Sequence, residues 1–475
     1  MNHLKKRPRP QQETAESVLS RGQIILLLLA LAGAIYGAVT NWHESSIIAI
    51  ACIMVFWIFF VGFQVLCCKV AIMHHIPVTS LVDINDPKLP SYSILIALYH
   101  EVKMLQHLVE AISNLQYDKS KLQVLLLLEE DDEETWSAVN NTTLPSYFSA
   151  VSIPSGGPRT KPNALNYGLK LATGEICVIY DAEDRPQSDQ LLKAVASFRH
   201  QPARIACLQA QLRFWNECST IITRFYWAEY VIHFERRLAG LAKLGCTPPL
   251  GGTSNHFVTA ILREIGGWDS FNVTEDADIA ARLACYGYSI AMLDSVTWEE
   301  ATANIRKADR QRRRWFKGYA QTGLVYTRRP ISTSRQMGLK NWFFFNLIML
   351  GTPLSTILSP IFWAATVIYF VTRTTIIQQL FPLPLYYMGI ILMIVGNLQL
   401  FYLMVDACMD QERKQNPEVD GYSSVKYMLL IPLWWAFTSW SAYISVFELI
   451  ISPHHWHKTE HGHDLEKEQL QEQIA

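Results

Sequence analysis

Two clusters of acidic residues follow apolar runs typical of buried strands. Residues 129–132 (EEDD) follow the run 123–128, and Asp181, Glu183 and Asp184 follow the run 176–180. Carboxylate oxygens are the ligands that Mg²⁺ and Mn²⁺ prefer, and acids at one edge of a sheet can converge on one ligand. For the first cluster a solvated acidic turn is an equal alternative. For the second cluster, the sequence predicts a site for a divalent cation and a diphosphate.

A loop between the two clusters carries glycines and cations. Residues 155–166 (SGGPRTKPNALN) place Arg159 and Lys161 at the start of a stretch expected to be helical. Backbone N–H groups at a helix start and the charge of a lysine attract phosphate oxygens. The loop therefore suits a phosphate-bearing ligand, and an ordinary loop with a helix cap is an equal alternative.

A carboxylate that could act as a base lies in residues 274–278 (TEDAD). A positioned carboxylate can accept a proton from a hydroxyl nucleophile, and Asp276 is one candidate in this segment. The alternative is that Asp276 and Asp278 only cap the helix that follows, which contributes about 1 kcal/mol.

The segment 311–315 (QRRRW) lies in a stretch, 303–319, that is expected to be helical. Gln311, Arg314 and Trp315 then share one face. A guanidinium binds diphosphate oxygens in a forked manner, and an indole offers a flat apolar surface to a ligand. Arg312 and Arg313 point elsewhere, and we expect them to contact anionic lipid headgroups.

These candidate residues need a sheet to position them, and residues 80–330 alternate between strand-like and helix-like segments. Strands are expected at 93–99, 123–128 and 176–180, with a helix at 103–114. The alternation predicts an α/β fold, a mostly parallel sheet covered by helices, with ligands at the carboxyl ends of the strands. The aromatic segment 225–234 is either a core helix or, as we prefer, a helix at a membrane interface.

Apolar residues gather at both ends of the chain. Segments 23–41 and 47–68 contain no Lys, Arg, Asp or Glu, and each is long enough to cross a hydrocarbon layer of ~30 Å. Basic residues precede the first segment and the loop 42–46 has none, which predicts a cytosolic N-terminus and a cytosolic middle domain. A cleaved signal peptide is the alternative for the first segment. Further apolar stretches cover 342–370, 385–405 and 428–451.

The charge balance and the cysteines exclude other classes. The chain has 41 Lys and Arg against 42 Asp and Glu, so nothing indicates a nucleic-acid partner. The nine cysteines lack paired metal-binding spacing, and we expect them to be reduced and structural.

The order of four motifs resembles the family 2 glycosyltransferases: 181–183 (DAE), 251–256 (GGTSNH), 274–276 (TED) and 311–315 (QRRRW). The whole chain is most similar to processive synthases of the cellulose, curdlan and hyaluronan type. The resemblance implies a GT-A-type nucleotide-sugar-binding domain flanked by transmembrane helices. The domains it implies are the cytosolic N-terminus with two transmembrane helices (1–75), a cytosolic catalytic domain with interfacial helices (76–330), a C-terminal transmembrane region (331–452), and a cytosolic gating-loop-like segment with the tail (453–475).

The resemblance also implies roles for single residues. Asp276 would be the general base of an inverting transfer, and Asp181 and Glu183 would hold Mg²⁺ or Mn²⁺, although the family carries aspartate where Glu183 stands. The substrate contacts that it implies are Glu130 or Asp131 for the nucleoside, Lys161 and Asp181 near the nucleotide, Gly252, Thr253 and His256 around the acceptor, Gln311, Arg314 and Trp315 on one helix, and Trp456 and Lys458 in the gating loop.

These features predict an enzyme that transfers a sugar from a UDP-sugar to the growing end of a β-linked polysaccharide, with export through an inner or plasma membrane. Glucose is the family-based choice of sugar, and accessory export subunits stay open. One alternative is a lipid glycosyltransferase of the ceramide glucosyltransferase kind, which adds a single sugar, and another is a transporter or scaffold with an inactive domain. The number of crossings is open, because a cytosolic gating loop needs an even number after the catalytic domain and three apolar stretches follow it.

Overall fold

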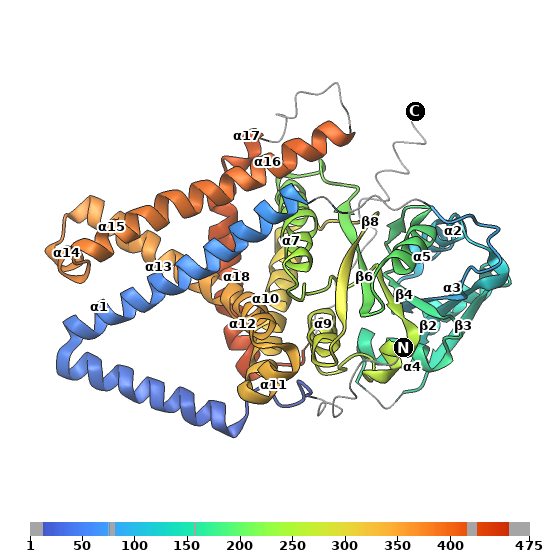
Figure 1. The fold of residues 1–475 in the computed structure, drawn as a ribbon, viewed down its shortest axis with the longest axis horizontal. Helices are drawn as coiled ribbons and strands as arrows, with labels where there is room; N and C mark the ends of the chain where they lie inside the picture. Colours follow the sequence, from blue (N-terminus) through green and yellow to red (C-terminus); the bar gives the residue numbers. More distant parts are fainter. Residues whose placement is uncertain (1–12, 75, 77–80, 156–157, 416–424, 456–475) are drawn as a thin grey trace.

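The structure is a computed structural model that describes residues 13–74, 76, 81–155, 158–415 and 425–455. A domain with a central sheet lies beside a group of long apolar helices (Figure 1). The active-site candidates fall in the region where the sheet domain meets these helices.

The sheet has eight strands in the order β3-β2-β1-β4-β7-β6-β8-β5. Four of its seven pairings are parallel, and β7 runs antiparallel to both neighbours. The mostly parallel α/β sheet is thus confirmed, with two antiparallel insertions. The strands are β1 (Tyr92–Leu98), β2 (Leu122–Glu129), β3 (Phe148–Ile153), β4 (Ile176–Tyr180), β5 (Arg185–Pro186), β6 (Ile205–Phe214), β7 (Asn255–Val258) and β8 (Ser289–Glu299).

One edge of this sheet collects the polar motifs. Strands β1, β2 and β4 are mutually parallel, and β6 and β8 run in the same direction because both are related to β4 through the antiparallel β7. Their carboxyl ends therefore meet at one edge. Strand β7 begins there, since Asn255 pairs with Ile179 near the end of β4. Residues after β4 and before β7 are thus brought together, as parallel-sheet geometry predicts.

Helices cover both faces of the sheet and give it two apolar cores. On one face α2 and α5 pack over β1, β2 and β4, and on the other α4, α8 and α9 do so. These apolar side chains are almost fully buried. Each Å² of apolar surface removed from water stabilises the fold by about 25 cal/mol. The helices of the domain are α2 (Leu105–Ser113), α3 (Glu133–Asn141), α4 (Lys161–Leu171), α5 (Gln190–His200), α8 (Thr259–Glu264) and α9 (Glu275–Cys285), with short 3₁₀ turns η1 (Val102–Met104) and η2 (Lys119–Lys121).

Helix α10 (Ile305–Thr327) lies against the start of α9. Gly318 makes this approach possible, because a Cβ atom there would come within 2.3 Å of the Thr274 side chain. Any larger residue would push α10 away from the loop that begins α9. The QRRRW segment is thus held close to the TED segment.

Among the described residues, three helical segments are long and apolar enough to cross a membrane: Arg21–Met73, Gly351–Thr372 and Leu383–Asp410. The first is α1, which is kinked at Asn41 (φ −153°) and forms two arms (Figure 1). This agrees with the two segments expected at 23–41 and 47–68. The C-terminal helices are α11 (Pro330–Met337), α12 (Leu339–Met349), α13 (Gly351–Thr372), α14 (Thr375–Leu380), α15 (Leu383–Ile391), the π-helix η4 (Leu392–Gly396), α16 (Asn397–Gln415), α17 (Val425–Met428) and α18 (Ile431–Ile451).

Helix α18 differs from the expectation of a further apolar span at 428–451. It is not among the three membrane-crossing candidates of the described chain, and it runs alongside α10, across the direction of α1 and α16 (Figure 1). One side of α18 is apolar and exposed, with Trp440 61% and Phe447 65% exposed. The other side contacts α10 through Ser441, whose hydroxyl donates to Asp309 over 2.7 Å. The composition alone suggested a span, whereas the helix is two-sided.

The aromatic segment 225–234 forms the end of α6 (Ile221–Tyr230) and the start of the π-helix η3 (Val231–Leu238), which continues into α7 (Ala239–Lys243). Phe225, Tyr226 and Trp227 are buried in a cluster with side chains of α1, α16 and α18. The segment is therefore a helix buried between the sheet domain and the apolar helices.

Candidate active site

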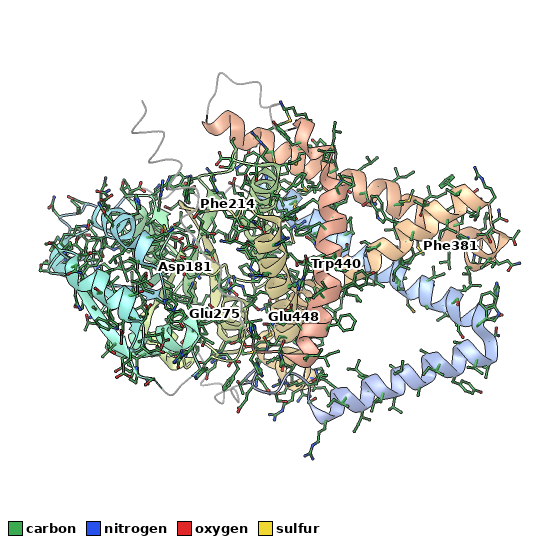
Figure 2. All side chains as sticks on the ribbon, turned by 180° about the vertical axis from the view of Figure 1, so that it is seen from behind. Asp181, Phe214, Glu275, Phe381, Trp440 and Glu448 are labelled. Carbon is green, nitrogen blue, oxygen red and sulfur yellow. The ribbon has the colours of Figure 1, made fainter. Side chains whose placement is uncertain are left out.

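A cavity of about 680 Å³ opens where the sheet edge, α10 and the apolar helices meet. Figure 2 places Asp181 and Glu275 at this junction, whereas Phe381 lies at the far end of the apolar helices. The cavity continues from the acidic motifs into the space between α1, α13, α16 and α18. A ligand bound at the sheet edge would therefore have a path into the apolar helices.

Asp181, Lys161, Gly252 and Asp276 form the centre of this site. The Lys161 ammonium forms an ion pair with Asp181 and donates to the Gly252 carbonyl over 2.8 Å. A Cβ atom at Gly252 would lie 3.7 Å from Asp276 Oδ2, so the glycine carries the backbone past the carboxylate. Burial favours a lower pKa for Lys161, but the opposing effect of Asp181 and the other nearby acids is larger. The pKa of Lys161 is therefore raised above its usual value. Lys161 is therefore a fixed positive charge among carboxylates.

Negative charge exceeds positive charge around this centre. Nine Asp or Glu side chains and five Lys or Arg side chains line the cavity. Burial, together with Asp181, holds the pKa values of Glu183 and Asp184 well above their usual range. Burial and the charge of Asp184 likewise hold the pKa of Glu299, at the end of β8, well above its usual range. Such a site stabilises a cation, because added positive charge relieves the repulsion between the carboxylates.

Asp184 gives a second indication that this acidic group suits a positive charge. Its Oδ2 accepts hydrogen bonds from the Asp181 amide over 2.7 Å and from the Thr253 hydroxyl. Its Oδ1 is buried without a hydrogen-bond partner in the described structure. Within the described residues, no three His, Cys, Asp or Glu side chains already form a cation-binding group.

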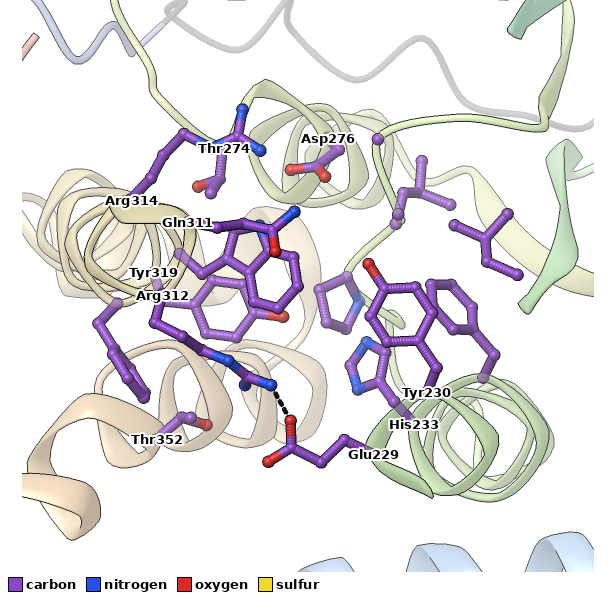
Figure 3. A pocket seen from close by; sticks show the side chains of 18 of the residues that line it. Glu229, Tyr230, His233, Thr274, Asp276, Gln311, Arg312, Arg314, Tyr319 and Thr352 are labelled. Carbon is purple, nitrogen blue, oxygen red and sulfur yellow. Dashed lines mark hydrogen bonds and ion pairs between the residues drawn. The ribbon is translucent and has the colours of Figure 1, made fainter. Parts of the chain in front are cut away.

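Asp276 stands in the first turn of α9 and faces the cavity (Figure 3). Its Oδ1 accepts a hydrogen bond of 2.7 Å from the Ala277 amide. Burial and then the neighbouring Glu275 raise the pKa of Asp276 to about 7. A carboxylate with such a pKa is a stronger base than an exposed aspartate, which suits proton abstraction near neutral pH. Asp278, by contrast, is buried in an ion pair with Arg282 at 2.7 Å and has a structural role.

Gln311, Arg314 and Trp315 on α10 all line the cavity, as their shared helix face predicts (Figure 3). Asp181 and Asp276 line the same cavity. The structure therefore brings together residues from three motifs that are far apart in the chain.

The expectation that Arg312 contacts lipid headgroups is wrong. Arg312 is buried, pairs with Glu229 of α6 and lies 4.6 Å from the ring centre of Tyr226. Trp434 of α18 donates to the same Glu229 over 3.0 Å. Arg313 pairs with Asp309 and Glu448 and is also inside the protein. Helix periodicity separates these faces correctly, but it cannot reveal that α6 and α18 cover them.

The first acidic cluster lies beside the cavity in a different register from the expected one. Glu129, the last residue of β2, lines the cavity, whereas Glu130 is exposed and accepts a hydrogen bond from the Ser155 amide over 3.1 Å. Asp131 is also exposed and pairs with Arg159, which lines the cavity. Successive side chains of a strand point to opposite sides. A shift of one residue in the register therefore moves a side chain from the cavity into solvent.

The segment 251–256 likewise contains some residues that line the cavity and another that does not. Gly252 and Thr253 line the cavity, but His256 is fully buried inside the sheet. The His256 ring contacts the Tyr92 hydroxyl at 2.5 Å and the Gln190 side chain at 3.2 Å. The expected contact of His256 with substrate is therefore wrong, because the residue stabilises the interior of the sheet.

Several cavity residues lie outside the motifs. Glu299 ends β8, and Tyr99 and Glu101 follow β1, so the rule that places ligands at strand ends could have indicated them had β8 been recognised. Tyr230 and His233 face Gln311 and Arg312 across the cavity from α6 and η3 (Figure 3). A π-helical turn, which is common at functional sites, leaves no clear sequence pattern. Trp456 and Lys458, expected in a gating loop, lie outside the described residues.

Two family models match this chain. Residues 93–250 match the model described as glycosyl transferase family 2, and residues 176–393 match glycosyl transferase family group 2. Among solved structures, a mannosyltransferase from Pyrobaculum calidifontis in complex with GDP-Man and Mn²⁺ is similar, with a TM-score of 0.47, 20% identity, and coverage of 74% of this chain and 98% of that chain.

Curated relatives are glycosyltransferases of several kinds. A probable glycosyltransferase of Bacillus subtilis is 25% identical over 55% of this chain and 63% of its own length. A beta-monoglucosyldiacylglycerol synthase of Trichormus variabilis is 26% identical over 50% and 51%, and a poly-beta-1,6-N-acetyl-D-glucosamine synthase of Staphylococcus aureus is 24% identical over 50% and 56%. The chain thus matches about half the length of these relatives. The matches to glycosyl transferase family 2 over residues 93–250 and to glycosyl transferase family group 2 over residues 176–393 support a sugar-transferring enzyme.

Proposed function

We propose that this chain is an inverting glycosyltransferase that transfers glucose from UDP-glucose to the growing end of a β-linked polysaccharide. The supporting observation is the single cavity that joins the acidic sheet edge, the Gln311–Trp315 face of α10 and the space between the apolar helices. Donor, acceptor and an exit path would thus share one continuous site.

The proposed step uses residues in contact with this cavity. Asp276 accepts the proton of the acceptor hydroxyl while that oxygen attacks the anomeric carbon from the face opposite the UDP. The new C–O bond forms as the bond between the anomeric carbon and the phosphate oxygen breaks, and UDP departs with the electron pair. A single displacement converts an α-linked donor into a β-linked product. Arg314 and Lys161 would stabilise the negative charge that appears on the diphosphate.

Asp181 and Glu183 would hold Mg²⁺ or Mn²⁺ against the diphosphate. The excess of carboxylates and the unpaired Asp184 Oδ1 support a positive ion here. A bound divalent cation would supply charge that offsets the developing charge of the leaving group. The family-wide pattern of two acids one residue apart fits these positions.

The membrane arrangement that we propose has four crossings: the two arms of α1, then α13, then the helix Leu383–Asp410. Helix α18 would lie along the cytosolic surface with its apolar side in the bilayer. Two crossings before the catalytic domain and two after it would leave that domain and the chain after α18 on one side. This arrangement would satisfy the even number that a cytosolic gating segment needs. We place the protein in an inner or plasma membrane.

The lining of the inner cavity favours a polysaccharide. Thr352, Ser355, Thr356 and Ser359 occur at helical spacing on α13, and all four line the cavity. Hydroxyl groups and aromatic rings such as Trp435 suit the polar edges and flat faces of sugar rings. The single-addition alternative is favoured by the relative that makes a glucosyl lipid. Incubating purified protein with radiolabelled UDP-sugars and measuring product length would distinguish the two products: a polymer supports the proposal, and a lipid carrying one sugar contradicts it.

Narrowing the inner cavity should shorten the polymer. In Thr356→Trp the indole would occupy part of the cavity, so the product chains should be shorter than those of wild type while the first transfer continues. The matched control is Val367→Trp on the same helix, because Val367 is 60% exposed and points away from the cavity. Chain length measured by gel filtration would test this, and unaltered chains in Thr356→Trp would mean that the polymer does not pass α13.

Activity should rise with pH through about 7. Asp276 must be unprotonated to accept a proton, and burial and Glu275 raise its pKa to about 7. Below that pH the carboxyl is protonated, and kcat/KM should fall about tenfold for each pH unit. Initial rates between pH 5.5 and 8.5 at saturating cation provide the measurement, and a flat profile over this range would contradict the assignment.

A further inference from the structure

An N-terminal arm, residues 13–20, crosses the catalytic domain before α1 begins. Its Ala15 is fully buried, in one apolar cluster with Ala277 and Ala281 of α9. Ala277 directly follows Asp276. A segment far from the catalytic motifs in sequence thus packs against the helix that carries the proposed base.

The arm is fixed by residues at the end of α10. Arg328 donates to the carbonyl oxygen of Thr14 over 2.8 Å and to that of Val18 over 3.2 Å. The Gln23 amide donates to the Leu324 carbonyl over 2.8 Å. These contacts hold the arm at both of its ends, so its position is specified independently of the loop beside it.

Asp269 connects the arm to the loop that leads to Asp276. Its Oδ2 accepts from the Ala15 amide over 2.6 Å, and its Oδ1 accepts from the Thr14 hydroxyl and the Phe271 amide, each over 3.1 Å. Asp269 is 6% exposed. A buried carboxylate that loses such donors is left with desolvated, unpaired oxygen atoms, which is unfavourable. The hydrogen-bond donors of the arm therefore fix the position of the Asp269 side chain.

The loop continues from Asp269 to α9 through a chain of hydrogen bonds. The Asn272 amide donates to the Asp269 carbonyl over 3.2 Å, and Asn272 Oδ1 accepts from the Thr274 amide over 3.0 Å. On the other side, the Asn272 side chain donates to the Thr322 hydroxyl of α10 over 3.0 Å. The loop is thus held between the arm and α10.

A residue that follows α18 also contacts both the loop and the arm. The ring nitrogens of His454 lie 3.0 Å from the Phe271 carbonyl oxygen and 3.1 Å from the Glu16 carbonyl oxygen. His454 therefore bridges the loop and the arm. Three segments that are distant in the chain meet at residues 269–272, seven residues or fewer before the base.

We propose that Asp269 is a positioning residue for Asp276 and that the N-terminal arm is a structural part of the active site. The inference deepens the proposed function and rests on Asp276 acting as the base. Without the Asp269 contacts, the loop loses its direct hydrogen bonds to the arm while it keeps those to α10 and to His454, and Asp276 can shift from the acceptor hydroxyl. A shift of about 1 Å at a reacting group can cost on the order of 100-fold in rate.

The first test compares variants that weaken the arm contact to different degrees. Asp269→Asn replaces an acceptor with an amide, Ala15→Pro removes the backbone donor, and Thr14→Val removes one hydroxyl. The control is Asp118→Asn, since Asp118 likewise accepts from the Ser120 amide, over 3.0 Å, in a turn outside the cavity lining. We expect kcat to fall about tenfold or more in Asp269→Asn and Ala15→Pro, less in Thr14→Val, with the KM for UDP-sugar unchanged.

The second test needs no activity. Hydrogen–deuterium exchange of peptides covering residues 269–280 should be faster in Asp269→Asn and in the mild Thr14→Val, and unchanged in Asp118→Asn. Exchange equal to wild type in both variants overturns the proposal, as does wild-type kcat in all three arm variants. If wild-type protein transfers no sugar from any UDP-sugar, the proposed function fails, while the exchange result still decides whether the arm holds the loop.

Discussion

Replacing Asp276 by Asn should abolish sugar transfer and leave UDP binding nearly intact. Asparagine has almost the same shape, so the first turn of α9 is preserved, but an amide cannot accept the proton of the acceptor hydroxyl. General base catalysis contributes about 10²–10⁴-fold, and kcat should fall by that factor. In the proposed arrangement Asp276 contacts neither the uracil nor the ribose of UDP. The Kd of UDP in the variant should therefore stay within about twofold of the wild-type value.

The matched control for this experiment is Asp189→Asn. Asp189 likewise lies at the start of a helix, as the N-cap of α5, but it forms a partly exposed pair with Lys193 at 3.0 Å and does not line the cavity. Its activity should equal that of wild type. Transfer rates from radiolabelled UDP-sugar and UDP binding by calorimetry provide the two measurements. Turnover of Asp276→Asn within tenfold of wild type would remove Asp276 from the base role and direct attention to Glu275.

Removing divalent cations should stop the reaction completely. Asp184 is buried, Asp181, Glu183 and Glu299 are half-buried, and Lys161 forms an ion pair with Asp181. A diphosphate would add further negative charge and needs a cation to enter. EDTA should therefore reduce transfer to background, and Mg²⁺ or Mn²⁺ in excess should restore it.

A variant separates the cation site from general effects of EDTA. Asp181→Ala should lower kcat by about 10²–10³-fold and raise the cation concentration needed for half-maximal rate. Glu183→Asp, which keeps a carboxylate, should retain most of the activity and serves as the control. Initial rates over a Mn²⁺ titration give both quantities. Full activity in the complete absence of divalent ions would rule out the role assigned to Asp181 and Glu183.

Local patterns were sufficient for the elements that carry the first motifs. Strands β1, β2 and β4 are short apolar runs that end in polar residues, and the structure places all three within two residues of the prediction. Helix α10 follows equally from the absence of Gly and Pro over 303–317. In these segments the local pattern and the tertiary packing agree, which is the usual condition for a correct assignment.

Other parts depended on contacts that a single sequence does not contain. His256 belongs to a strand of four residues and meets Tyr92, which lies 164 positions earlier. Arg312 is covered by Glu229 of α6 and by aromatic rings, so its partners could not be read from its own helix. Strand β8 pairs with β6 through register shifts, which weakens the regular alternation that identifies strands.

The close contact between α1 and α7 has a consequence for folding. A Cβ atom at Gly240 would lie 1.9 Å from the Cys67 carbonyl oxygen, so two backbones touch there. Around this point Phe63 and Ala71 of α1 share one apolar cluster with Leu212 of β6. The domain boundary at residue 75 that the resemblance implies therefore cuts through a common hydrophobic core. Both halves should melt in a single cooperative transition, and the sheet domain should gain its final stability only after the second arm of α1 has docked.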